Sequence, residues 1–231
     1  MSRFIPILAY HSLDPGRFPN NKLAISPQIF RQQMLLLKKW GFKIVTLESC
    51  ARGGWTEGFL DRKAAITFDD GYADNYRWAL PVLKEFGFAA TFFATPQDIG
   101  QEGFMNWDML REMAEVPGIE IGSHGLEHRP LSDIPEKEAW ISLVASKKIL
   151  EEQLGREVSA ISYPSGSFNE KIVEMAQGAG YAYGCAASHI HDRKFIGNPY
   201  LLRRIKISSS SQSAAAFALR LSGFYHSFGR P

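Results

Sequence analysis

The sequence predicts an α/β protein built as a (β/α) barrel with seven or eight parallel strands. Short apolar runs alternate with longer segments of helical periodicity along the whole chain. The runs are bounded by turn residues and are mostly β-branched or aromatic, which is typical of buried strands. Strands that alternate with helices pair in parallel. Seven or eight such units in 231 residues fit a closed barrel better than an open doubly wound sheet, which stays an alternative.

Eight segments are expected as strands, because each is a short apolar or aromatic run between turn residues. In chain order they are 5–10, 43–47, 64–68, 89–94, 119–122, 158–162, 182–187 and 204–207.

Five segments are expected as helices. The first begins at the pair Ser26 and Pro27, an N-cap followed by proline at the first helical position, and it ends before Gly41. The other four are 74–86, 135–154, 169–177 and 211–221.

The composition is that of an ordinary globular protein, and we expect one domain spanning residues 1–231. Hydrophobic residues make up 45% and charged residues 22% of the chain. The net charge of +2 gives no electrostatic reason to expect nucleic acid or an anionic membrane as a partner. Cys50 and Cys185 are expected to be reduced, because two cysteines are too few for a disulfide scaffold. The sequence does not indicate an oligomeric state.

The N-terminal segment MSRFIPILAYHSLDPG is interpreted as a buried strand. Its apolar run is barely long enough for a signal peptide and contains Pro6. No segment approaches the roughly 18 apolar residues of a membrane span. As it stands, the sequence therefore predicts a cytoplasmic protein, with peripheral association with a membrane as an alternative.

Unusual polar residues follow four of the expected strands. In a barrel, reactive residues lie at the carboxyl ends of the strands, so these side chains are expected on one rim. They are His11 after the first strand, Asp69 and Asp70 after the third, His124 and His128 after the fifth, and 163–166 after the sixth.

The carboxylates and histidines of this rim predict a divalent metal site. Two adjacent carboxylates after an apolar strand are costly unless a cation compensates them, although Asp-Asp-Gly is also good turn chemistry. His124 and His128 are four residues apart, so both imidazoles can face one point; unrelated surface histidines are the alternative. One carboxylate and two imidazoles leave open coordination positions, which is typical of catalytic sites. Iron oxygenases usually carry an H-x-D or H-x-E pair, which is not seen here, so hydrolysis is favoured.

The segments ITFDDGYADN, SHGLEH and YPSG resemble the first three motifs of the polysaccharide deacetylase family, carbohydrate esterase family 4. The resemblance runs from about residue 5 to about residue 207 and is greatest to the branch that deacetylates poly-N-acetylglucosamine. It implies a distorted (β/α) barrel that removes N-acetyl groups from amino sugars in a glycan or glycan precursor. It also implies one divalent metal, with zinc expected and nickel, cobalt or manganese as alternatives.

Carried over residue by residue, the resemblance implies that Asp69 is the general base acting on a metal-bound water. Asp70, His124 and His128 would be the metal ligands. A backbone amide near Ser165 would help to bind the oxyanion. The segment that forms the third motif would bind substrate and shape the groove through Tyr163, Pro164, Ser165 and Gly166.

The chain departs from the common family pattern at two positions. The late Leu-x-Leu-His motif that often supplies the general acid is not found, but the segment ILAYHS resembles the branch in which an N-terminal histidine does this work. We therefore predict that His11 is the general acid, with a rim histidine as the alternative. Ser162 stands where the third motif usually carries an arginine, and Arg204 is expected to replace that arginine, with a solvated strand-edge arginine as the alternative.

Three further aromatic or histidine positions are open to more than one interpretation. Trp107 could stack on a sugar or belong to the core. His189 and His191 are interpreted as part of a solvated loop.

Two other functions stay open at this point. The same scaffold can hydrolyse a small cyclic amide or imide, or the protein could bind carbohydrate without turning it over. Asp69 argues against the second alternative, because a base is not needed to hold a metal.

Overall fold

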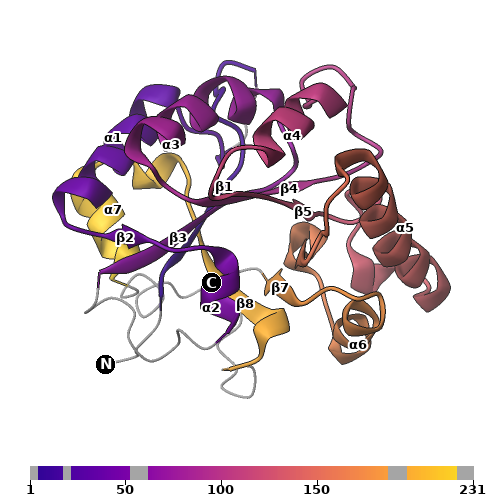
Figure 1. Ribbon diagram of the computed structural model, residues 1–231. Helices are drawn as coiled ribbons and strands as arrows, with labels where there is room; N and C mark the ends of the chain where they lie inside the picture. The colour runs from indigo at the N-terminus through magenta and orange to yellow at the C-terminus, as the bar shows by residue number, and fades with distance from the viewer. Residues whose placement is uncertain (1–4, 18–21, 53–61, 187–196, 223–231) are drawn as a thin grey trace.

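The structure is a computed structural model that describes residues 5–17, 22–52, 62–186 and 197–222. Its centre is a closed barrel of seven parallel strands with one further strand outside it (Figure 1). The barrel strands are β1 (Ile7–Tyr10), β3 (Lys63–Phe68), β4 (Ala90–Ala94), β5 (Ile119–Ser123), β6 (Ala160–Ser162), β7 (Tyr183–Ala186) and β8 (Leu202–Lys206). The outer strand is β2 (Lys43–Ile44), which pairs with β3. The predicted fold is confirmed.

Strand β1 closes the barrel, because it pairs with β3 on one side and with β8 on the other. Leu8 is in register with Ile66 of β3 and with Ile205 of β8. The carboxyl ends of all seven strands therefore meet at one rim, and the residues that follow β1, β3, β5 and β6 are brought together there.

Helices surround the barrel in an outer layer (Figure 1). They are α1 (Pro27–Lys39), α2 (Leu47–Ala51), α3 (Leu80–Phe86), α4 (Trp107–Ala114), α5 (Glu136–Leu154), α6 (Glu170–Gly178) and α7 (Ala214–Leu221), with a π-helical turn (Asn75–Ala79) leading into α3. Helix α1 starts as expected, since the Ser26 side chain accepts a hydrogen bond from the Ile29 amide and Pro27 is the first helical residue.

Two helices differ from the sequence-based expectation. The expected strand 43–47 is shorter, because Thr46 caps α2 and the helix starts at Leu47. Helix α4 was not expected; Asn106 caps it by accepting a hydrogen bond from the Met109 amide.

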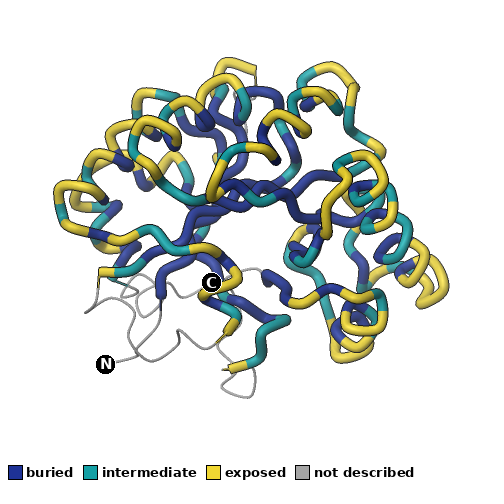
Figure 2. Tube along the Cα trace, viewed as in Figure 1, coloured by how far each residue is buried: buried dark blue, intermediate teal, exposed yellow. Residues whose placement is uncertain are grey.

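The core has two layers, because successive side chains of a strand point to opposite faces. One layer lies between the barrel and the helices and includes Tyr10, Phe68 and Phe92, of which the last two stack with ring centroids 4.5 Å apart. The other layer fills the barrel and includes Phe93 and Cys185. Figure 2 shows the barrel strands mostly buried and the outer faces of the helices exposed. Polar side chains that extend this inner layer toward the rim are therefore shielded from solvent.

Cys50 and Cys185 are both buried and free, as expected. Within the described residues, no helix has the length and apolar character that crossing a membrane requires.

Candidate active site

A sharp turn after β3 separates the two adjacent carboxylates. Asp70 has φ 71 and Gly71 has φ 77, both in the left-handed region. Aspartate tolerates this region better than most residues, and glycine adopts it freely. Asp69 consequently stays on the inner face of the barrel, whereas Asp70 turns toward the loop that follows β5.

Asp70 meets two histidines in that loop. Its Oδ1 atom lies 3.4 Å from Nε2 of His124 and 3.5 Å from Nε2 of His128. The three ligand atoms all lie within 4.8 Å of one another. His124 is buried, whereas the His128 side chain is 43% exposed, so the cluster opens to solvent on the His128 side.

These three residues fit a divalent metal ion. The Oδ1 atom of Asp70 is buried and has no hydrogen-bond partner among the described residues. His124 Nδ1 donates to the carbonyl oxygen of Ser162 at 2.7 Å, which in the neutral imidazole leaves the Nε2 lone pair facing Asp70. One carboxylate and two imidazoles are ligands that several first-row ions accept, so the donor set does not identify the ion.

Asp69 forms a buried ion pair with Arg204 of β8. Nη1 of Arg204 lies 2.7 Å from Oδ1, and Nη2 lies 2.8 Å from Oδ2. Burial alone would raise the pKa of Asp69, but the charge and hydrogen bonds of Arg204 outweigh it and hold that pKa well below its usual range. Asp69 is therefore a fixed, ionised carboxylate beside Asp70.

His11 lies opposite Asp69 at the end of β1. The Asp69 amide donates to the Tyr10 carbonyl at 2.9 Å, which brings the two strand ends together. His11 Nε2 is 3.8 Å from Asp69 Oδ2, and its Nδ1 has no hydrogen-bond partner in the described part of the chain. Burial lowers the pKa of His11, and the Asp69 charge acts in the opposite direction. The imidazole is thus held next to the carboxylate that the sequence predicts as the base.

Asp74 and Asn75 hold the loop that carries His11. Asn75 Nδ2 donates to the carbonyl oxygen of His11 at 2.8 Å. Asp74 accepts hydrogen bonds from the Ser12 hydroxyl at 2.6 Å and from the Leu13 amide at 3.0 Å. All of these groups are buried, so the position of His11 is set by the helical turn that follows the Asp-Asp pair.

Comparison with known proteins identifies the family. Residues 57–184 match the family model described as polysaccharide deacetylase. The chain belongs to the polysaccharide deacetylase family, carbohydrate esterase family 4.

Relatives of this chain cover most of its length. It is 31% identical over 212 residues to Bacillus subtilis YxkH, which is provisionally described as a polysaccharide deacetylase; the match covers 91% of this chain and 74% of the relative. It is 28% identical over 232 residues to a Staphylococcus aureus poly-β-1,6-N-acetyl-D-glucosamine N-deacetylase, covering 88% of this chain and 79% of that protein.

Solved structures of similar proteins share the fold. The Streptococcus pyogenes deacetylase PplD in complex with acetate has a TM-score of 0.83 at 26% identity, covering 96% of this chain and 99% of PplD. IcaB from Ammonifex degensii has a TM-score of 0.79 at 23% identity, covering 95% and 98% of the two chains, and this likeness concerns the fold alone.

The third motif is mostly a support for the rim. Tyr163 was predicted to bind substrate; its side chain is completely buried and packs against Phe168 with ring centroids 5.7 Å apart, so it lies in the core and not at the surface. Pro164 is buried too, because both side chains fill the space beneath the loop. Ser165 is exposed and has φ 57, and Gly166 is half-buried with φ 71. These two residues stay candidates for substrate contact.

Trp107 is the first residue of α4 and is half-buried. It packs against the core layer between barrel and helices, which corresponds to the core alternative rather than to a side chain free to stack on a sugar. His189 and His191 lie outside the described residues.

Sequence reasoning missed the hydroxyls around Arg204. Thr67 Oγ1 lies 3.2 Å from Nη1, and Ser162 Oγ lies 2.8 Å from Nη2. Thr67 is two residues before Asp69 on the same strand, and a period of two places both on the inner face. That periodicity could have indicated Thr67, whereas nothing local indicates the Ser162 contact.

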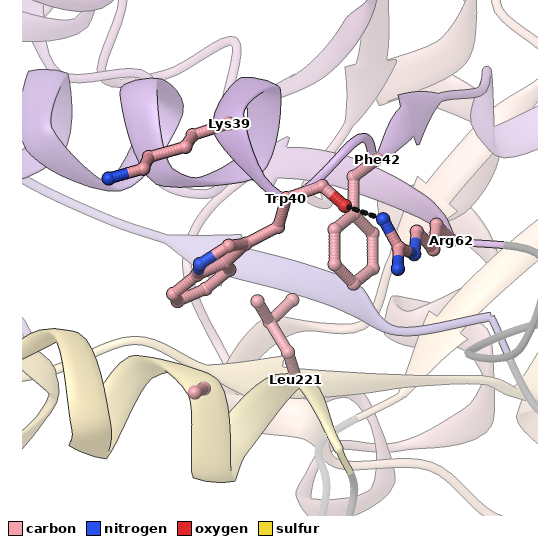
Figure 3. A pocket seen from close by; sticks show the side chains of 6 residues that line it. Lys39, Trp40, Phe42, Arg62 and Leu221 are labelled. Carbon is pink, nitrogen blue, oxygen red and sulfur yellow. Dashed lines mark hydrogen bonds between the residues drawn. The ribbon is translucent and has the colours of Figure 1, made fainter.

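A hollow lies near the amino ends of β2 and β3. Figure 3 shows Trp40 and Leu221 facing it, with Arg62 donating to the Trp40 carbonyl. Its lining comes from the end of α1, the residues just before β2 and β3, and α7: Lys39, Trp40, Phe42, Arg62, Ala218 and Leu221. It is therefore separate from the metal cluster, which lies at the carboxyl ends of the strands.

Proposed function

We propose that this chain is a metal-dependent carbohydrate N-deacetylase. It hydrolyses the acetamide of N-acetylated amino sugars in a glycan or glycan precursor. The observation that carries the proposal is the ionised, arginine-held Asp69 directly beside the Asp70, His124 and His128 cluster. Support comes from the family, from the named substrate of the Staphylococcus aureus relative, and from the acetate bound to PplD.

Asp70, His124 and His128 would hold one divalent ion, with zinc expected and nickel, cobalt or manganese as alternatives. When bound, the ion supplies Lewis-acid polarisation of the acetamide oxygen and of the attacking water. The opening on the His128 side gives the acetamide access to the cluster.

Asp69 accepts the proton of the attacking water. Each carboxylate oxygen has two lone-pair positions, so both oxygens can bind Arg204 and one can still face the water. Arg204 makes the carboxylate a weaker base, and in return it fixes the direction in which the lone pair points. The hydroxide adds to the acetamide carbon.

His11 delivers a proton to the nitrogen as the carbon–nitrogen bond breaks. The products are acetate and a free amine, and an amine leaves slowly unless its nitrogen is protonated. His11 Nε2 lies 3.8 Å from Asp69 Oδ2, so the two groups are close enough to act on the same reacting acetamide.

The Ser165 amide is the proposed donor to the developing oxyanion. The amides of Gly166 and Ser167 donate within the turn, to Tyr163 and Pro164. Ser165 itself is exposed, and its positive φ orients the backbone of this turn differently from a regular helix. A backbone donor on an exposed turn that follows a barrel strand suits stabilisation of negative charge on oxygen.

Acetate release from N-acetylglucosamine oligomers tests the proposal, run with zinc, cobalt and nickel and with a chelated control. We expect metal-dependent release that is lost in Asp69→Asn while the metal stays bound. Asp108→Asn, at an exposed side chain on α4, is the matched control and should keep full activity.

Two outcomes would overturn the proposal. Turnover of a cyclic amide or imide, with no acetate release from any sugar, would favour the small-amide hydrolase. Glycan binding without any turnover would favour a carbohydrate-binding protein.

A further inference from the structure

We propose that Ser162 is a positioning residue that joins the two halves of the catalytic site. Its hydroxyl holds the arginine that orients the base, and its carbonyl orients a metal-binding histidine. The inference rests on the proposed deacetylase function and adds a residue to it. Ser162 is completely buried at the end of β6 and does not itself reach the substrate.

The hydroxyl of Ser162 supplies one of the four hydrogen bonds made by the terminal nitrogens of Arg204. A guanidinium has four terminal N–H groups. Those of Arg204 meet the two Asp69 oxygens at 2.7 and 2.8 Å, Thr67 Oγ1 at 3.2 Å and Ser162 Oγ at 2.8 Å. With the two hydroxyls on either side of the carboxylate, the guanidinium cannot rotate away from Asp69 without losing a buried hydrogen bond.

The backbone of Ser162 acts on the other half of the site. Its carbonyl oxygen accepts the hydrogen bond from His124 Nδ1 at 2.7 Å, which orients the imidazole toward Asp70. Ser162 is itself held in the sheet opposite Cys185 of β7. One fixed residue therefore sets the direction of both Arg204 and His124.

The two contacts of Ser162 can be separated by substitution, because every residue keeps the carbonyl. Ser162→Ala removes the acceptor for Arg204 Nη2 and leaves the His124 contact in place. Ser162→Thr keeps the hydroxyl and adds one methyl group. Ser211→Ala is the matched control, because Ser211 is equally buried, uses its hydroxyl in a hydrogen bond with the Ser208 amide, and lies before α7.

Steady-state kinetics and metal content of these variants test the inference. A hydrogen bond to a charged group is worth enough to change kcat by roughly 10- to 100-fold. We expect Ser162→Ala to lose about that much kcat while KM and bound metal stay unchanged, and Ser162→Thr to recover most of it. Ser211→Ala should lower the unfolding midpoint and leave kcat unchanged. An unchanged kcat in Ser162→Ala, or a loss fully explained by missing metal, would overturn the inference.

A double-mutant cycle separates this inference from the proposed function, because it does not need activity. The unfolding equilibrium is measured for wild type, Ser162→Ala, Arg204→Lys and the double variant. If the hydroxyl acts through Arg204, the effect of Ser162→Ala on the unfolding constant should be several-fold smaller in the Arg204→Lys background. Additive effects would refute the link even if acetate release is confirmed. Coupled effects without acetate release would refute the function and leave the link standing.

Discussion

Arg204 and Asp69 are 135 positions apart in the chain, yet they form a bidentate ion pair inside the barrel. The two nitrogen–oxygen distances are 2.7 and 2.8 Å. The guanidinium also lies against the Phe93 ring, 5.5 Å from its centroid. Both side chains are almost completely shielded from water. Loss of either partner would leave an uncompensated buried charge, so stability and the proposed catalysis depend on the same contact.

Substitution of Arg204 should therefore lower both the free energy of unfolding and the rate of acetate release. We expect Arg204→Met to lower the free energy of unfolding by about 3–5 kcal/mol, measured by urea denaturation near neutral pH. Because the pKa of Asp69 is depressed in the folded state, this stabilisation is present above the ordinary carboxyl pKa and is lost as pH falls through the folded value. The control is Arg129→Met at an exposed ion pair, with an expected change below about 1 kcal/mol. Equal losses in both variants would contradict the prediction.

Metal binding should stabilise the protein through the histidine cluster. An ion at about 100 times its dissociation constant adds about 2.7 kcal/mol to the free energy of unfolding. Because the His128 side chain is 43% exposed, His128→Ala should leave the metal-free stability nearly unchanged and abolish the increment. His124→Ala should destabilise the metal-free protein too, since His124 is buried and bonded to Ser162. Thermal unfolding with a chelator measures the metal-free stability, and unfolding with zinc measures the stabilisation by metal. Stabilisation by zinc that persists in His128→Ala would exclude this site.

The role of His11 should depend on the leaving group. His11→Ala should lower the rate of acetamide hydrolysis by about 100-fold or more, because the amine needs a proton to leave. In an activated acetyl ester such as 4-nitrophenyl acetate, the leaving group is 4-nitrophenolate, which departs without being protonated. Hydrolysis of this ester should therefore persist in His11→Ala and be lost in Asp69→Asn. The two rates are compared for each variant at saturating metal. Parallel losses on amide and ester in His11→Ala would show that His11 is not the acid.

A partly buried carboxylate on β5 should make stability depend on pH. Glu120 of β5 accepts hydrogen bonds from the Thr91 hydroxyl at 2.7 Å and from the Tyr183 phenol, and burial raises its pKa. With the folded pKa above the unfolded one, stability falls as pH rises from the unfolded pKa to the folded pKa.

Glu120→Gln should remove this decline. Urea denaturation between about pH 4 and pH 8 should show the variant gaining on wild type as pH rises. Wild type and variant should converge at the acidic end, where Glu120 is protonated. A constant difference at all pH values would contradict the prediction.

The sequence allowed the barrel to be predicted because its strands are short, apolar and separated by recognisable helix signals. Helix α4 was not predicted because it is short and its main sequence signal is the single N-cap residue Asn106. The outer strand β2 was expected to be longer, because its apolar pattern runs on into α2, where Leu47 and Cys50 are buried inside a helix. Local pattern does not show where such a run changes from extended to helical.

The candidate metal cluster could be predicted because its three residues lie in two short motifs. The Arg204 contact could be expected only as a replacement for a missing arginine. Its hydroxyl partners Thr67 and Ser162 depend on which inner faces meet across the barrel, which no single segment encodes. Tyr163 was expected to shape the groove because of its place in the third motif, whereas the structure buries its side chain in the core.

The place of β1 between β3 and β8 has a consequence for how the molecule is made. Strand β1 is synthesised early, and the edge of β1 that pairs with β8 stays unpaired until β8 has been synthesised. A chain cut short before Leu202 would still contain Asp69 and every residue of the metal cluster. It would lack the cation that holds Asp69 and the strand that completes the ring. The proposed active site is therefore completed only near the end of synthesis. Incomplete chains contain the candidate metal ligands but lack Arg204, which holds Asp69 in place.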